Sequence, residues 1–343
     1  MIRLAIDAMG GDHAPEQIIK GTLKALSEFK DITVILYGDE TKMAPYLTPH
    51  DRLEVVHTDK YLDMGEQDPV SQFRKNKDAS MFLAMKAVKE GKADAIVSAG
   101  PTQALVVAGH LIIKRLPTMK RVAIAPMIPS LIKGKSTILL DGGANVDLKA
   151  EHLEELAVYA TVVAKALLHV KNPLVGLLNI GTEEGKGRAL DIETYALLKE
   201  NPNINFLGNV EPKEMLETKA DILLSDGFTA NIAMKSVEGT AKSLASLLKE
   251  QLTSSFFKKL IVGLFLKKSL KSFKKALDPN EIGGAMIAGL QNIVIKAHGS
   301  SNDYAFYNAI RQAKELVEAD VIGKVTSLLE TNAKTVWSTS NKT

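Results

Sequence analysis

Short apolar segments alternate with amphipathic segments along most of the chain. The apolar segments are rich in β-branched residues and have the length of buried strands. They are Ile2–Ile6, Ile32–Leu36, Leu53–His57, Ala95–Ser98, Val122–Ala125, Thr137–Leu140, Val175–Leu178, Asn205–Leu207 and Ile222–Leu224. Between several of them apolar residues recur at helical spacing, as in Ala79–Lys89, Glu151–His169 and Asp191–Glu200. This alternation predicts βαβ units and an α/β fold with a mainly parallel sheet.

The end of the chain is helical in pattern. Asp303–Trp337 is predicted to form a helix that breaks or bends near Gly323. No repeat of fixed period and no disordered linker divides the sequence. A chain of 343 residues is long enough for one large α/β domain or two smaller ones.

Composition narrows the class of protein. The chain is 45% hydrophobic and 24% charged, which is typical of soluble proteins. A net charge of +3 and 5% aromatic residues argue against a nucleic-acid partner. The absence of cysteine excludes disulfides, thiolate metal sites and a cysteine nucleophile. The sequence shows no secretory signal pattern and no run of ~20 apolar residues, so we expect a cytoplasmic protein.

The first predicted strand leads into a turn that contains glycines and ionisable residues. The apolar run ends at Asp7 and is followed by Gly10, Gly11, Asp12 and His13, and Pro15 then suits the start of a helix. Free backbone N–H groups and the helix dipole make such a turn a natural anion site. Ionisable side chains beside the glycines make it a candidate reaction site.

Other loops of the same kind follow other predicted strands. They combine small residues with Asp, Asn, Lys or His, and they are Ser98–Gln103, Asp141–Asn145, Asn179–Gly187, Ser225–Asn231 and Ala297–Asn302. One such loop has a purely structural explanation, because strand-to-helix turns favour Gly, Asp and Asn. Parallel strands end at a common edge, so we expect all of these loops to gather on one edge of the sheet.

Familiar catalytic signatures are missing. Pro129–Ser136 nearly matches a phosphate-binding loop, but it begins with proline and leads into a strand instead of a helix. Gly181–Lys186 is one residue too short for that motif. No dinucleotide fingerprint, serine elbow or H-E-x-x-H motif is present. The obvious covalent and metal-dependent mechanisms therefore lose support.

Taken together, the loops resemble those of the bacterial phosphate acyltransferase family, PlsX. The matching segments run in order over nearly the whole chain: Ile6–Pro15, Leu140–Asp141, Gly143–Asp147, Leu177–Gly181, Glu184–Gly187, Asn205–Phe206, Gly208–Glu211, Asp226–Phe228 and His298–Ser301. The chain departs from the family pattern at Pro101, Gln103, Gly142 and Ala230.

The resemblance implies a fold and an activity. The family makes acyl phosphate from acyl carrier protein thioesters and inorganic phosphate, the entry to phosphatidic acid synthesis. The implied fold is a three-layer α/β/α sandwich similar to phosphotransacetylase and the isocitrate/isopropylmalate dehydrogenase group, assembled as a homodimer. We expect one such domain over residues 1–343, from which an amphipathic helical segment, residues 250–278, protrudes.

For phosphate to attack a thioester, an enzyme must position the two reactants, and it needs no covalent intermediate of its own. Phosphate is already an anion at neutral pH, and the leaving thiol has a pKa near ~8.5. The site must hold the anion against the carbonyl and supply donors to the developing oxyanion. The catalytic candidates are Lys186 as a cation, Asn231 as a donor, and His298 and His13 as donors or proton sources. Each also has an ordinary structural explanation, as a surface lysine, a helix-start residue or a structural histidine.

Further residues are candidates for binding phosphate or substrate. They are Gly10, Gly11, Asp12, Asn145, Gly185, Gly187, Asp226, Gly227, Ser300 and Ser301. Carboxylates repel phosphate, so the aspartates are expected to orient donors instead of touching the nucleophile. No cofactor and no metal site are expected, and an exposed acidic turn is the favoured interpretation of Glu183 and Glu184.

The segment Ser254–Leu277 is basic and apolar, with many lysines and no acidic residue. Two short amphipathic helices that break at Gly263 fit its pattern. Core helices rarely carry such one-sided charge, so we favour an element that enters an anionic membrane surface over core packing. Its expected membrane contacts are Phe257, Leu260, Ile261, Leu264 and Phe265. The same lysines also suit acidic acyl carrier protein.

These observations predict an acyltransferase that acts on long-chain acyl carrier protein and phosphate. The expected partners are acyl carrier protein, inorganic phosphate, anionic phospholipids, a second copy of the chain and a downstream glycerol-3-phosphate acyltransferase, with no nucleic acid. The expected location is the cytoplasm, at the inner face of the cell membrane. The alternatives are a phosphotransacetylase-like enzyme that uses short acyl-CoA and a non-catalytic acyl carrier at the membrane surface.

Overall fold

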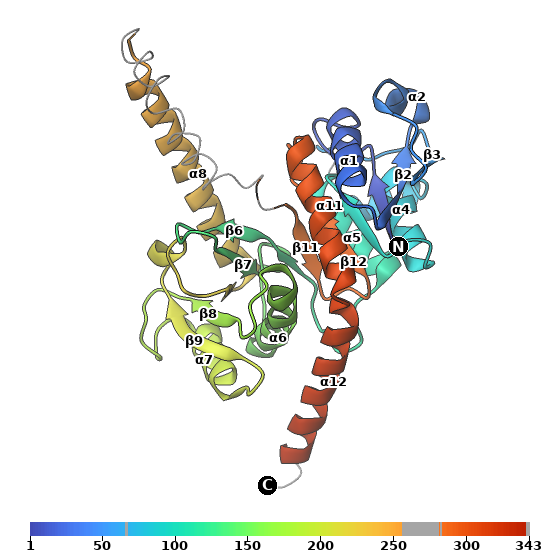
Figure 1. The fold of residues 1–343 in the computed structure, drawn as a ribbon. Coiled ribbons are helices and arrows are strands. Elements are labelled where there is room, and N and C mark those ends of the chain that lie inside the picture. The colour runs from blue at the N-terminus through green and yellow to red at the C-terminus, as the bar shows by residue number, and fades with distance from the viewer. Residues whose placement is uncertain (66–67, 256–280, 282, 341–343) are drawn as a thin grey trace.

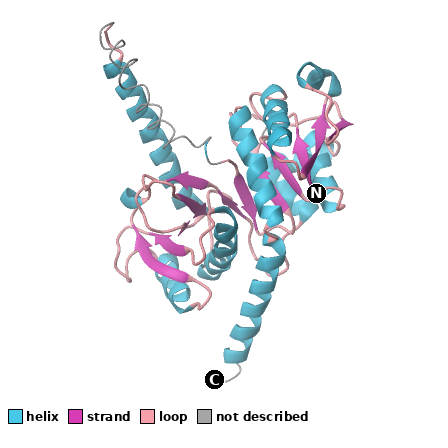
Figure 2. Cartoon of the chain, viewed as in Figure 1, coloured by secondary structure: helices cyan, strands magenta, loops and turns pink. Residues whose placement is uncertain are grey.

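The computed structural model describes residues 1–65, 68–255, 281 and 283–340, with the backbone alone over 332–340. Its strands form two sheets, each covered by helices on both faces (Figures 1 and 2). The α/β class, the mainly parallel strands and the sandwich of helices around them are as predicted. The division into two sheets was not predicted.

The larger sheet has seven strands in the order β3-β2-β1-β4-β12-β11-β5. They are β1 (Ile2–Asp7), β2 (Ile32–Gly38), β3 (Leu53–His57), β4 (Ala95–Ser98), β5 (Ala123–Ala125), β11 (Ala285–Ala288) and β12 (Ile293–Lys296). Only β11 runs antiparallel to its neighbours in this sheet. One face packs on α1 (Glu16–Glu28) and α11 (Asp303–Glu318), and the other on α4 (Ser80–Lys89) and α5 (Thr102–Ala108).

The smaller sheet has five strands in the order β6-β7-β10-β8-β9. They are β6 (Met127–Pro129), β7 (Ser136–Leu140), β8 (Leu174–Leu178), β9 (Asn205–Val210) and β10 (Ile222–Leu224), and only β6 is antiparallel. Helices α6 (Ala150–Leu167) and α7 (Ala189–Glu200) cover one face. The start of α8 (Gly227–Leu252) covers the other, and the rest of α8 extends away from the sheet (Figure 1).

One hydrophobic core connects the sheets. It includes alternate residues of strands in both sheets together with α6 and α11, which pack against each other. In the described residues, the remaining helices are α2 (Glu40–Met43), α3 (Pro69–Lys75), α12 (Val321–Ser340) and the short helical turns Ala44–Tyr46, Gly109–Ile113 and Pro212–Glu214. No helix within the described ranges is both long enough and apolar enough to cross a bilayer.

Most predicted elements are confirmed within a few residues of their ends. The prediction missed β6, β11 and β12, which have only three or four residues each; prolines border β6 and glycines border β11. The predicted C-terminal helix does break, but at Ala319–Asp320, before Gly323. Asp320 there has a positive φ of 48°, a conformation that ends an α-helix.

Asp141 joins the two sheets at the end of β7. Its buried carboxylate accepts hydrogen bonds from the Ile124 N–H of β5 (2.9 Å) and from the backbone N–H groups of residues 143–145 (2.7–3.1 Å). The N–H of Gly142 in turn donates a hydrogen bond to the Ile124 carbonyl at 2.6 Å. The Asn145 side-chain amide donates both to Asp141 (2.8 Å) and to the Val122 carbonyl (2.7 Å). One carboxylate therefore ties the edge of the larger sheet to the smaller one.

Loss of this carboxylate should destabilise the whole chain. In Asp141→Asn, at least one backbone N–H group that now faces a carboxylate oxygen would face the NH₂ of the amide. The remaining hydrogen bonds would lose their charged acceptor, and a hydrogen bond to a charged group is worth ~1.5–3 kcal/mol. We expect the free energy of unfolding in urea to fall by about 3 kcal/mol or more. The exposed Asp147→Asn serves as the control and should unfold like the parent. Equal midpoints for the two variants would contradict this account.

Candidate functional site

The loops predicted to share one sheet edge fall into two groups. The first loop group, residues 7–13, 98–103 and 297–302, follows β1, β4 and β12 of the larger sheet. The second loop group, residues 141–145, 179–187 and 225–231, follows β7, β8 and β10 of the smaller sheet. The expectation of a single edge was wrong, because strand periodicity does not reveal which strands pair. Among the described residues, no hydrogen bond or ion pair links the two groups.

Asp7 sets the geometry of the first loop group. Its buried carboxylate accepts hydrogen bonds from Ser80 Oγ of α4 and Ser98 Oγ of β4, both at 2.6 Å. Burial raises the pKa of Asp7, and these hydroxyls oppose that effect. Gly10 lies so close that a Cβ there would stand 2.5 Å from the Asp7 carboxylate and 2.6 Å from the Gly100 nitrogen. Asp7 is therefore part of the loop's framework.

The opening turn keeps backbone donors available. Gly11 has a φ of 111°, and the N–H of Asp12 donates to the Gly299 carbonyl at 2.8 Å, which ties this turn to the loop after β12. The N–H groups of Gly11 and His13 have no acceptor among the described residues. The side chains of Asp12 and His13 are exposed. Free N–H groups in a turn that leads into a helix suit an anionic or carbonyl oxygen.

His298 lies on the surface of the same group. Its Nδ1 accepts the N–H of Ser300 at 3.2 Å and lies 2.9 Å from Ser300 Oγ, so the ring carries its proton on Nε2. Partial burial of the ring is the main cause that lowers the pKa of His298, and the positive charge of Lys296 is the second. Glu238 of α8 and Asp12 oppose that shift. The ring is therefore a neutral donor. Ser300, which was predicted to bind phosphate or substrate, positions the ring instead. The buried Ser301 donates its N–H to the His298 carbonyl.

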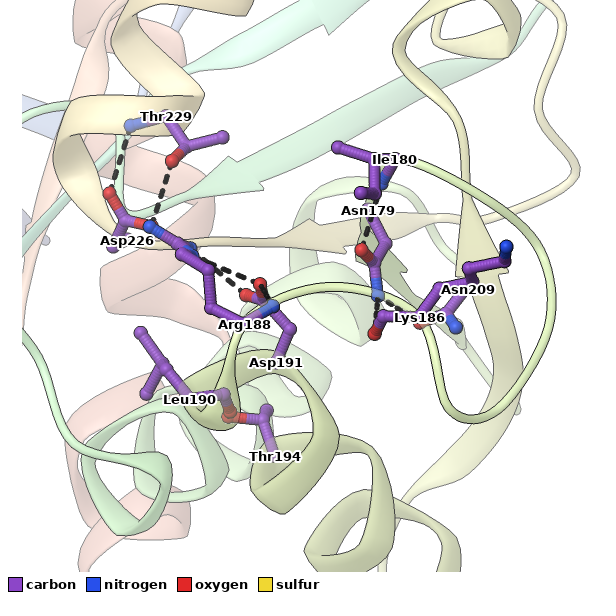
Figure 3. Close-up of polar contacts among 10 residues, drawn as sticks. All are labelled: Asn179, Ile180, Lys186, Arg188, Leu190, Asp191, Thr194, Asn209, Asp226 and Thr229. Carbon is purple, nitrogen blue, oxygen red and sulfur yellow. Dashed lines mark hydrogen bonds and ion pairs between the residues drawn. The ribbon is translucent and has the colours of Figure 1, made fainter.

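Asn179 shapes the loop that carries Lys186 in the second loop group (Figure 3). Its side-chain amide donates to the Lys186 carbonyl (3.0 Å) and to Asn209 Oδ1 (3.2 Å), and its oxygen accepts the Ile180 N–H. Gly187 has a φ of 96°, and a Cβ there would lie 2.6 Å from Asn179 Oδ1.

The Lys186 side chain is 50% exposed. Its ammonium lies 4.0 Å from Glu183, at the limit of an ion pair, and a Cβ at the neighbouring Gly185 would meet no atom within 4 Å. This arrangement leaves Lys186 able to bind an anion.

Arg188 was not among the predicted site residues. Its guanidinium donates to Asp191 (2.9 and 3.0 Å) and to Asp226 (2.5 Å), which links the starts of α7 and α8 (Figure 3). Asp226 also accepts the N–H and hydroxyl of Thr229. Burial alone would raise the pKa of Asp226, but the bonds from Thr229 and Arg188 lower it. Asp226 is thus a helix cap with its oxygens already engaged.

The predicted residues at the base of α8 are packed together. The Gly227 N–H donates to the Asn145 carbonyl (2.8 Å), and a Cβ on Gly227 would lie 2.4 Å from that oxygen. The Asn231 amide donates to the Gly142 carbonyl at 2.9 Å and lies against Gly143, whose φ is 130°. Asn145 and Gly227 therefore hold the loops in place, whereas Asn231 keeps a second amide hydrogen for a ligand.

The proposed membrane contacts Phe257, Leu260, Ile261, Leu264 and Phe265 lie outside the described residues. The described part of α8 leads to them and exposes Leu244, Leu247 and Leu248. These leucines recur at intervals of three and four residues, so they share one face of the helix.

Comparison with known proteins identifies the family. The model of the fatty acid synthesis protein family matches residues 2–324. The phosphate acyltransferase of Acholeplasma laidlawii is 56% identical over 96% of this chain and 98% of its own length. The phosphate acyltransferase of Bacillus cereus is 47% identical over the same shares.

A phosphotransacetylase from Streptococcus pyogenes shares the fold. The TM-score is 0.61 at 17% identity, covering 92% of this chain and 94% of that one. The sandwich expected from the loop motifs is therefore confirmed. The chain belongs to the fatty acid synthesis protein family, the family of the phosphate acyltransferases, as its loops predicted.

Proposed function

We propose that the chain transfers a long acyl group from acyl carrier protein to inorganic phosphate. A phosphate oxygen attacks the thioester carbonyl, the carbon–sulfur bond breaks, and the phosphate proton passes to the leaving thiolate. The products are acyl phosphate and free carrier thiol, an early step toward phosphatidic acid. Family membership over nearly the whole chain carries this proposal. It disfavours the two alternatives, a short-chain acyl-CoA enzyme and a non-catalytic acyl carrier.

In this proposal the second loop group holds phosphate. Lys186 supplies an ammonium at a loop tip flanked by glycines, and Asn231 supplies an amide hydrogen beside the start of α8. Arg188 holds Asp191 and Asp226, so these carboxylates present less free negative charge to the anion. Donors close to the anion stabilise the charge that develops in the transition state.

The first loop group then receives the thioester. The Nε2–H of His298 and the backbone N–H groups of Gly11 and His13 are donors for the carbonyl oxygen, which becomes negative as phosphate attacks. His13 stands beside this position with an exposed ring that can relay the phosphate proton to sulfur. Gly10, Ser300 and Ser301 hold the backbone that presents these groups.

The two groups become one site in a homodimer, each site taking one group from each copy. Exposed apolar side chains lie in or beside the second loop group: Val146, Ile180, Phe228 and Ile232 are 52–79% exposed. Such side chains on loops and helix starts are typical of surfaces that a partner covers. A second copy seated there would cover them and bring its first loop group to the phosphate.

The segment Ser254–Leu277 is proposed to bind the inner face of the cell membrane. Its lysines attract anionic phospholipids, and its apolar residues enter the interface. The exposed leucines on the preceding part of α8 fit an element that leads away from the sheets (Figure 1). Membrane binding would deliver acyl phosphate beside a glycerol-3-phosphate acyltransferase that consumes it.

Lys186→Ala should lower the rate of acyl phosphate formation from palmitoyl-acyl carrier protein and phosphate by about 10²-fold or more. Lys171→Ala is the matched control, because Lys171 is an exposed lysine near the opposite end of β8. It should act like the parent. Normal turnover by the Lys186 variant would remove this residue from the site, and absence of phosphate-dependent product with the parent would refute the activity.

Replacement of Leu260, Leu264 and Phe265 with serine should abolish binding to anionic liposomes and spare activity on soluble substrates. The reason is that polar side chains remove the apolar area that enters the interface. Flotation of liposomes measures this, with the half-exposed Leu131→Ser as a control. If the triple variant floats with the liposomes as the parent does, another surface binds the membrane.

A further inference from the structure

A buried lysine lies beneath the first loop group. Strands β1, β4 and β12 are neighbours, and their register pairs Ile6 with Val97 and Ser98 with Lys296. Residues paired across parallel strands point to the same face of the sheet, so Ser98 lies between Asp7 and Lys296. The hydrogen bond from Ser98 Oγ to Asp7 fits this order. The sheet edge thus carries a carboxyl, a hydroxyl and an ammonium in a row.

Lys296 is only 8% exposed. Its ammonium donates to the carbonyl oxygens of Ala99 (3.2 Å) and Ala297. No carboxylate oxygen of the described residues lies within 4.0 Å of it. Burial lowers the pKa of Lys296 to about 8, and the charges of Asp7 and Asp12 oppose that effect. A buried cation without an ion pair costs stability, which points to a function for it.

The two carbonyls belong to different loops. Ala99 lies in the loop after β4, and Ala297 is the residue immediately before His298 in the loop after β12. The ammonium therefore connects these loops and fixes the backbone from which the imidazole projects. The positive charge of Lys296 also lowers the pKa of the His298 ring, as does that of Lys242. The negative charges of Glu238 and Asp12 raise it.

We propose that Lys296 is a positioning residue for acyl transfer: its ammonium holds the 297–302 loop in place and keeps the His298 ring neutral, with its proton on Nε2. The inference rests on the role given to His298 in the proposed function. A protonated ring would lose the bond that Nδ1 accepts from Ser300, and with it the orientation of Nε2.

The test compares Lys296→Gln, which removes the charge but keeps a donor, with Lys296→Arg, which keeps the charge. Titration of the His298 ring by NMR in the full-length protein, and the pH profile of kcat/KM, are measured for both. In the glutamine variant the titration and the acid limb of the profile should move to higher pH, because a nearby positive charge has gone. The plateau kcat should fall about tenfold. In the arginine variant the acid limb should stay in place.

Lys296→Met replaces the glutamine variant if circular dichroism shows that glutamine disturbs the fold. An unshifted His298 titration in the uncharged variant overturns the inference about Lys296, whatever the activity. If the titration shifts while the acid limb stays in place, the role assigned to His298 is overturned. Full activity of His298→Ala refutes that role independently. These outcomes separate a failure at Lys296 from a failure of the proposed function.

Discussion

The arrangement of this chain depends on one buried carboxylate. Asp141 accepts hydrogen bonds from β5 of the larger sheet and from the loop that follows β7 of the smaller sheet. The loop it shapes places the Asn145 carbonyl against Gly227 and the Gly142 carbonyl against Asn231, at the start of α8. The relative position of the sheets and the base of α8 therefore follow from the same set of contacts.

The aspartates of the two loop groups share a role that follows from their charge. Asp7, Asp141 and Asp226 are buried, and serine, backbone or arginine donors engage each of them. A carboxylate so engaged organises a loop without standing free beside phosphate. The available donors are instead Lys186, His298 and the backbone of the opening turn.

The sequence was sufficient to predict the class, most strands and the residues of the loops. Each of these depends on local pattern, such as the apolar run that ends at Ile6 or the glycines beside Lys186. It was not sufficient to predict which strands pair, and so one expected edge became two loop groups. Arg188 and Lys296 were missed for a related reason. Their significance comes from partners far away in sequence, Asp226 and the carbonyl of Ala99.

We propose that one catalytic site draws Lys186 from one copy of the chain and His298 from the other. The direct measurement is the acyl phosphate activity of a mixed dimer, purified through two tags, of a Lys186→Ala copy and a His298→Ala copy. Each variant dimer alone should be nearly inactive. The mixed dimer should recover about half of the parent rate, because one of its two sites keeps both residues. A mixed dimer as inactive as the two variant dimers would show that Lys186 and His298 do not come from different copies.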